Sequence, residues 1–300
     1  MSEDVDKLEQ ALKAKDEKTL IDITLSHKNA ERVKLREEYN TKFSSDLLKD
    51  FEKYLSSDFL KVMKAVYMSP AEYDAELFYL AMKGIGSDKA TMTELLCFRT
   101  PERIEEIKQK FKEMYKKDLV EEVMDETSGD YKKIAKILLQ GNRGTNKNPD
   151  LETCKKIAKE IYDAGEGKIG TNEEVFIKYF TELSPDELLL VCKEYEKSHK
   201  KHILDTIEGE FSSHVKDLLK IILYGLFSPS EYYAKQIYDS IAGVGTSDKK
   251  LVRCVVSRSE VDMGRIKKYY KKLFNKDMIE DVKGDIKGSY FTLMEGLMKD

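Results

Sequence analysis

The sequence contains no tryptophan, and only five prolines and sixteen glycines interrupt its 300 residues. So few helix breakers favour long helical segments. Cysteine is also scarce, and the four present are scattered without a CxxC pair: Cys97, Cys154, Cys192 and Cys254. This pattern predicts reduced, mostly buried thiols in a cytoplasmic protein.

Long apolar segments are missing as well. The first twenty residues are polar and charged, so no signal segment is expected. The longest apolar run, residues 221–227, is far shorter than the roughly 20 residues needed to cross a bilayer. We therefore expect any membrane contact to be peripheral and reversible.

Neither sign of charge dominates. Charged residues make up 36% of the chain, yet the net charge is only -4. Such near-cancellation is typical of solvated amphipathic helices, and a mildly acidic chain does not attract nucleic acid or anionic membranes. We expect no nucleic-acid partner, and a membrane partner would require another source of positive charge.

The most informative feature present is an internal repeat. Residues 67–88 superpose on residues 226–247 at a shift of 159, which aligns Pro70 with Pro229. A third copy follows the same register. Three glycine loops are each followed, 40 residues after the last glycine, by an acidic residue: Gly86 and Glu126, Gly170 and Glu210, Gly245 and Asp285.

The N-terminal segment is a fourth, altered copy. The sequence KGIGSD of the second copy is shortened to KAKD at residues 13–16, and Tyr54 takes the position of the acid. Because loop and acid are lost together, we infer that they serve one purpose. The predicted repeats are residues 1–66 (glycine loop and acid lost), 67–140, 141–225 (with a polar linker at its start) and 226–300.

Between these landmarks the apolar residues have helical spacing, and no alternating run is long enough to propose a sheet. We therefore predict an all-α fold. Thr171 and Glu174 match a capping box, which predicts a helix starting at Thr171. Ser87 and Thr246 are predicted caps in the other two loops.

The third loop, residues 164–174, permits three interpretations. Gly165, Gly167 and Gly170 match a dinucleotide fingerprint, but the preceding segment is helical rather than a strand, and the other loops lack the third glycine. A phosphate-binding loop would need a lysine directly after Gly170. A cation loop fits better, because glycines let successive carbonyls converge and a distant carboxylate adds two oxygens. Calcium prefers six to eight oxygens, so about five protein ligands leave room for water or a lipid phosphate.

A single loop of this kind would be better explained as a tight helix–helix turn with a solvated acid. Three loops with one interval, and a copy lacking both parts, favour calcium. No EF-hand pattern exists. His199 and His202 have metal-ligand spacing, but a solvated helix end is the favoured interpretation. No nucleophile–base set can be assembled, so we expect no enzymatic activity.

An apolar residue lies between the key glycines of each loop: Ile85, Ile169 and Val244. Local packing against the helix ends is one explanation. Shallow insertion into a lipid interface is the other.

These motifs resemble those of the annexin family over essentially the whole chain. The family's K-G-x-G-T loop, with an acid about forty residues on, is similar to residues 83–87 and 242–246, and its third-repeat variant A-G-E-x-K-x-G-T is matched by residues 164–171. The resemblance implies four homologous five-helix repeats arranged as a curved disc. Few residues precede the first repeat, so the long N-terminal tail of some annexins is expected to be absent.

The resemblance also implies which residues hold Ca²⁺. The second repeat would use the carbonyls of Met82, Gly84 and Gly86 with the carboxylate of Glu126. The third would use Gly165, Lys168 and Gly170 with Glu210. The fourth would use Ile241, Gly243 and Gly245 with Asp285, whose shorter side chain departs from the family's pattern.

We therefore expect a cytoplasmic protein that binds acidic phospholipid membranes in a calcium-dependent manner. The alternative is a calcium-independent helical-repeat scaffold for cytoskeletal or other proteins. Binding that ignores calcium would favour this alternative. Besides the membrane, cytoskeletal proteins or a second copy of the chain are the expected candidate partners.

Overall fold

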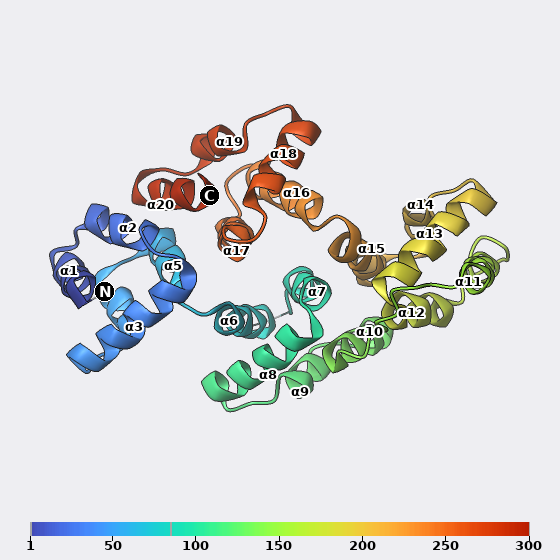
Figure 1. The fold of residues 1–300 in the computed structure, drawn as a ribbon, viewed down its shortest axis with the longest axis horizontal. Helices are drawn as coiled ribbons and strands as arrows, with labels where there is room; N and C mark the ends of the chain where they lie inside the picture. The colour runs from blue at the N-terminus through green and yellow to red at the C-terminus, as the bar shows by residue number, and fades with distance from the viewer. Residues whose placement is uncertain (1, 85, 300) are drawn as a thin grey trace. The chain divides into compact units, whose positions relative to one another are not determined.

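The computed structural model describes residues 2–84 and 86–299, and all regular secondary structure in these ranges is α-helical (Figure 1). The predicted all-α class is confirmed. The twenty helices found there fall into four sets of five that follow the sequence repeats. None of them is long and apolar enough to span a bilayer.

The helices of the four repeats have the following bounds. The first repeat contains α1 (Ser2–Ala14), α2 (Glu17–Leu25), α3 (Asn29–Phe43), α4 (Leu47–Tyr54) and α5 (Ser57–Val66). The second contains α6 (Pro70–Met82), α7 (Lys89–Phe98), α8 (Pro101–Tyr115), α9 (Leu119–Asp125) and α10 (Gly129–Gln140). The third contains α11 (Leu151–Ala164), α12 (Glu173–Glu182), α13 (Pro185–His199), α14 (Ile203–Glu210) and α15 (Ser213–Phe227). The fourth contains α16 (Pro229–Ile241), α17 (Asp248–Arg258), α18 (Met263–Phe274), α19 (Met278–Asp285) and α20 (Gly288–Lys299).

Equivalent residues start and stop equivalent helices. The third helix of every repeat is followed by a residue in the left-handed region, with φ between 49° and 58°: Ser44, Lys116, Lys200 and Asn275. The next helix is capped by a side chain that accepts a backbone N–H two residues on: Asp46, Asp118, His202 and Asp277. Such a cap satisfies an N–H that has no partner within the helix. The repeat in sequence is therefore also a repeat in local structure.

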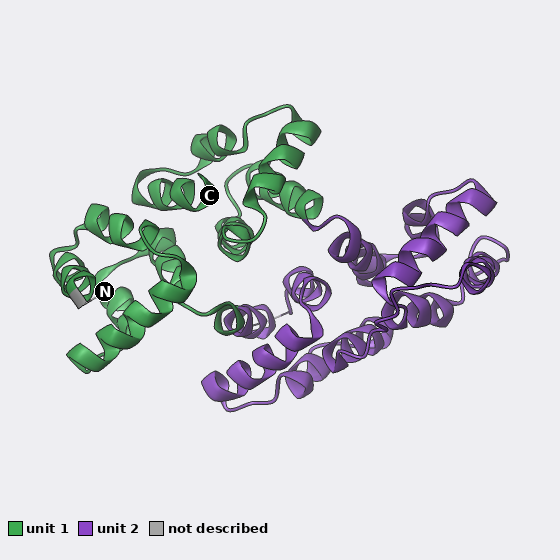
Figure 2. Ribbon diagram, in the orientation of Figure 1, with its two compact units in different colours: residues 1–73, 230–300 green, residues 74–229 purple. Residues whose placement is uncertain are grey.

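The helices form two compact units (Figure 2). One unit comprises residues 1–73 and 230–300, so it joins the first and fourth repeats. In it, α2 and α5 pack against α20. The other unit comprises residues 74–229, where α7 packs against α15 and α11 against α13.

Apolar side chains at helical spacing fill the core of each unit. In α8, for example, Ile104, Ile107 and Phe111 are buried. The crossing of α7 and α15 is especially close, because a Cβ at Gly225 would lie 2.6 Å from the carbonyl oxygen of Cys97. No residue larger than glycine fits there without a shift of backbone.

Candidate metal sites

The candidate loops connect the first two helices of the second, third and fourth repeats. One backbone hydrogen bond closes each loop, and it ties the residue two positions after the last glycine to the end of the preceding helix. These bonds run from Asp88 to Ala81 (2.7 Å), from Asn172 to Ala164 (2.7 Å) and from Ser247 to Ser240 (2.8 Å). The three loops therefore close in the same way, although the third is one residue longer.

The last glycine of each loop adopts the same left-handed conformation. The φ angles are 81° at Gly86, 83° at Gly170 and 82° at Gly245. A Cβ at these positions would meet nothing within 4 Å, so backbone conformation and not space explains the glycine. These glycines lie at the surface.

A hydroxyl residue follows each of these glycines and contacts the distant acid. Thr171 Oγ1 donates to Glu210 Oε2 at 2.5 Å, and Thr246 Oγ1 donates to Asp285 Oδ2 at 3.1 Å. In the second repeat, Ser87 Oγ lies 3.5 Å from the main-chain oxygen of Glu126. The fold thus brings each predicted acid next to its predicted loop.

The third loop shows the closest association between acid and backbone. A Cβ built on Gly165 would lie 3.3 Å from Cγ and 3.4 Å from Cδ of Glu210, so the absence of a side chain lets this carboxyl group lie against the start of the loop. Glu210 is half-buried, whereas Glu126 and Asp285 are exposed. No hydrogen bond links the Glu126 carboxylate to its loop within the described residues.

The predicted carbonyl ligands are largely free to bind a cation. Met82 and Ile241 end α6 and α16, and the last carbonyls of a helix have no partner within it. Among the predicted carbonyls, only that of Gly165 accepts a hydrogen bond from a described residue in the loops, the amide of Lys168 at 3.1 Å. Neutral carbonyls with one carboxylate are the hard oxygen donors that calcium prefers. The residues present therefore fit Ca²⁺.

The first repeat retains the backbone hydrogen bond that closes the loop, but the loop itself is shorter and contains no glycine. The amide of Asp16 donates to the carbonyl of Ala11 at 2.8 Å, so only four residues are enclosed. Lys13 pairs with Glu9 at 2.5 Å, and Tyr54 ends α4 where the other repeats have an acid. This arrangement therefore lacks the glycines and the acid that form the candidate sites of the other three repeats.

The apolar residues at the loop tips point into solvent. The relative exposure is 104% for Ile169 and 110% for Val244, which does not agree with packing against helix ends. Ile85, the corresponding residue of the second repeat, lies outside the described residues.

The predicted capping box at Thr171 and Glu174 is wrong. α12 begins at Glu173 after Asn172, and the Thr171 hydroxyl bonds to Glu210 instead. Ser87 and Thr246 are likewise not caps. Asp88 caps α7 by accepting from the amide of Thr91, and Ser247, not Thr246, is the N-cap residue of α17. The hydroxyl residues 87, 171 and 246 thus lie next to the predicted acids at the candidate sites, a position that the cap predictions missed. Their common position directly after the last glycine was the available signal.

The histidine pair gives no support for a transition-metal site. His199 stacks on Tyr162 with ring centroids 3.9 Å apart, and His202 caps α14 through Nδ1. Within residues 2–84 and 86–299, no three His, Cys, Asp or Glu residues are grouped so as to hold a metal ion. A loop site with one carboxylate and several carbonyls would not form such a group.

Comparisons with known proteins agree with the repeat pattern. A sequence model of the annexin family matches residues 3–66, 73–138, 156–222 and 232–297. Annexin A7 of Homo sapiens is 31% identical over 293 residues, which are 97% of this chain and 60% of that protein, so the chain spans about three fifths of this relative. Among solved structures, annexin III has a TM-score of 0.95 at 32% identity, covering 100% of this chain and 94% of that chain. Calcium-bound annexin (Sm)1 has a TM-score of 0.88 at 25% identity, covering 100% and 90%.

Proposed function

This chain belongs to the annexin family, and we propose that it binds acidic phospholipid membranes in a calcium-dependent manner. Annexins are generally non-enzymatic, membrane-binding proteins, and one of the structural relatives has been solved with calcium bound. One observation carries the proposal for this chain. In its third and fourth repeats, the residue after a left-handed glycine holds an acidic side chain that lies 39 positions further on.

The proposed ligands are main-chain carbonyls and one carboxylate in each of three loops. They are Met82, Gly84, Gly86 and Glu126; Gly165, Lys168, Gly170 and Glu210; Ile241, Gly243, Gly245 and Asp285. When bound, calcium would supply the positive charge that a chain of net charge -4 lacks, and would leave coordination positions for lipid phosphate oxygens.

The protein's own residues prepare the sites and add an apolar contact. Thr171 and Thr246 hold their acids at the loops, which lowers the entropy lost when the carboxylates bind a cation. Ile169 and Val244 are fully exposed at the tips, and we propose that they enter the lipid interface.

The three sites are not expected to be equal. Glu210 is half-buried and its carboxylate is hydrogen-bonded, so the third loop is the best prepared. Asp285 is shorter by one methylene, and the exposed Glu126 carboxylate has no hydrogen bond to the described residues of its loop. Because each loop has a single charged ligand, affinity in solution should be weak, on the order of 10⁻⁴ M or poorer. Joint engagement of one membrane would strengthen binding through avidity.

Vesicle cosedimentation tests this function. The chain should sediment with phosphatidylserine vesicles in calcium, and remain in the supernatant with EGTA or with phosphatidylcholine vesicles. Sedimentation that is equal in calcium and EGTA would instead support the calcium-independent scaffold.

A further inference from the structure

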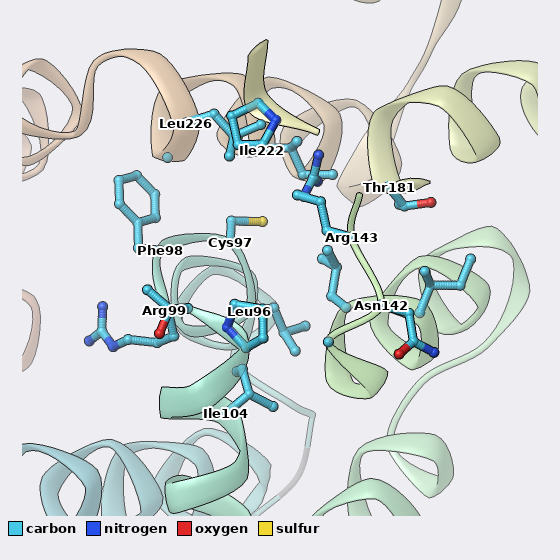
Figure 3. A pocket seen from close by; sticks show the side chains of 17 residues that line it. Leu96, Cys97, Phe98, Arg99, Ile104, Asn142, Arg143, Thr181, Ile222 and Leu226 are labelled. Carbon is cyan, nitrogen blue, oxygen red and sulfur yellow. The ribbon is translucent and has the colours of Figure 1, made fainter. Parts of the chain in front are cut away.

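The unit of residues 74–229 contains a cavity of about 240 Å³ that none of the candidate calcium loops lines (Figure 3). Residues of α7, α8, α10, α12, α13 and α15 and of the linker after α10 surround it. Its walls are mostly apolar, with Leu96, Ile104, Ile137, Ile222 and Leu226 among them. Apolar walls with a few polar groups are typical of small-molecule sites.

Arg143 gives this cavity a positive charge. Its Nη1 donates to the carbonyl of Leu183 at 2.9 Å and its Nη2 to the carbonyl of Phe180 at 2.6 Å. Within the part of the chain that the structure describes, no carboxylate forms an ion pair with Arg143. Burial lowers the pKa of this guanidinium. Arg99, the other arginine of the lining, is directed away from Arg143 in Figure 3. Its guanidinium bonds to Asp74.

Arg32, in the unit of residues 1–73 and 230–300, is the internal counterpart of Arg143. Its Nη1 donates to the carbonyls of Thr24 at 3.1 Å and His27 at 2.5 Å. The shift of 156 that aligns Asp16 with Asn172 places Thr24 on Phe180 and His27 on Leu183. The two guanidinium groups therefore bind equivalent carbonyls at the ends of α2 and α12. They reach them from different places in the chain, since Arg32 lies in α3 and Arg143 in the linker.

The two arginines differ in what else they bind. Arg32 Nη2 donates to the Glu260 carboxylate at 2.7 Å, and Nε donates to the carbonyl of Val66 at 2.9 Å. The repeat shifts of 159 and 156 place Glu260 on Pro101 and Val66 on Ile222. Both Pro101 and Ile222 line the cavity. In the unit of residues 1–73 and 230–300, a carboxylate pairs with Arg32. At the equivalent position, the unit of residues 74–229 therefore has a proline that lines the cavity.

A nearby acid of the same unit does not take this role. Glu187 lies beside the linker at Gly144, but one of its carboxylate oxygens accepts from Asn146 at 2.8 Å and the other from the amide of Ser184 at 3.0 Å. These bonds cap the start of α13. Within the residues that the structure describes, the guanidinium of Arg143 is thus left without a carboxylate partner.

We propose that this cavity binds a small organic carboxylate, whose headgroup pairs with Arg143 as Glu260 pairs with Arg32. The guanidinium has N–H groups beyond the two that bind carbonyls, and planar carboxylates suit them. At about 30 Å³ per water molecule, the volume corresponds to a ligand on the order of ten non-hydrogen atoms. The apolar part of the ligand lies against Leu96, Ile222 and Leu226.

The probe is 4-fluorobenzoate, observed by ¹⁹F NMR with the full chain in EGTA, and 4-fluorobenzamide is its neutral control. We expect saturable binding of the benzoate with a Kd of about 1 mM or tighter, and at least about tenfold weaker binding of the benzamide. Equal binding of both probes, or binding of neither, would overturn the proposal. Because calcium is absent, the outcome does not depend on the membrane function.

A variant can supply the missing carboxylate from the chain itself. Pro101 is the first residue of α8, where an acidic side chain is compatible with the helix. Pro101→Glu should reduce 4-fluorobenzoate binding at least about tenfold, while Pro101→Gln, which also loses the proline, should bind as the unchanged chain does. Pro101→Glu should also unfold at a higher temperature than Pro101→Gln. Equal probe binding by the two variants contradicts the proposed position of the carboxylate.

Discussion

The hydroxyl oxygen of Thr171 lies 2.5 Å from Oε2 of Glu210, although 39 positions separate the two residues. The bond connects the loop after α11 to the end of α14. Thr246 and Asp285 are connected in the same way in the fourth repeat, at 3.1 Å. The loop and the acid are therefore one structural element in each of these repeats.

Glu210→Gln removes the only charged ligand proposed for the third loop. We expect it to raise the calcium concentration needed for half-maximal vesicle binding by about tenfold. Glu208→Gln is the matched control, because Glu208 lies on the same helix but pairs with Lys216 and Lys220. Equal calcium requirements for the two variants would argue against a ligand role for Glu210.

Thr171→Val removes the hydroxyl that positions Glu210 and leaves the shape of the side chain nearly unchanged. Loss of such an outer contact lowers metal affinity by roughly tenfold, so the calcium requirement should rise accordingly. Thr171→Ser keeps the hydroxyl and should stay close to the unchanged chain. A calcium titration of vesicle binding measures the calcium requirement of both variants. Identical curves for Thr171→Val and Thr171→Ser would exclude a role of the Thr171 hydroxyl in positioning Glu210.

Ile169→Ser and Val244→Ser test contact of the loop tips with lipid. Each removes an exposed apolar side chain whose burial in a membrane would stabilise the complex by about 1.5–3 kcal/mol. Together they should weaken vesicle binding at saturating calcium at least about tenfold. Val261→Ser is the control, since Val261 is 66% exposed but lies in the connection between α17 and α18. The tips have no membrane role if all three changes leave binding intact.

Ionisation of Tyr67 is expected to cause part of the protein's loss of stability at alkaline pH. This side chain is fully buried, and burial raises the pKa of its hydroxyl to about 12, against about 10 in an unfolded chain. Between these two pH values the unfolded state therefore binds fewer protons than the folded state. The contribution of the Tyr67 hydroxyl to the free energy of unfolding is intact below pH 10 and is lost as the pH rises toward 12. At pH 11.5 the loss is about 2 kcal/mol relative to pH 9.

Urea unfolding at these two pH values measures that loss. Tyr67→Phe should be less stable at pH 9, because the hydroxyl lies 3.3 Å from Thr24 Oγ1, but its stability should fall less on going to pH 11.5. An identical fall in both proteins would show that Tyr67 does not titrate in this window.

Much of the fold and the site could be predicted because the chain repeats. The spacing of Gly170 and Glu210 recurs at the other loops, and this recurrence predicted which distant residues meet. Thr171 was misread for the opposite reason. A threonine three residues before a glutamate satisfies a local capping rule, whereas its actual partner is brought in by the tertiary fold.

The hydrogen bonds of Arg143 could not be predicted from the sequence, because its partners are also brought in by the tertiary fold. It lies in a polar linker, and its counterpart Arg32 lies in a helix, so the repeat register does not align them. Only the positions of the helix ends in space show that both arginines bind equivalent carbonyls.

The most direct test of the central claim is cosedimentation with phosphatidylserine vesicles over a calcium titration, using a chain that carries Glu126→Gln, Glu210→Gln and Asp285→Asn together. If the three loops hold the calcium that joins the chain to lipid, the unchanged chain sediments with increasing calcium and the triple variant stays in the supernatant while remaining folded by circular dichroism. Calcium-dependent sedimentation of the triple variant at the same midpoint would contradict the account.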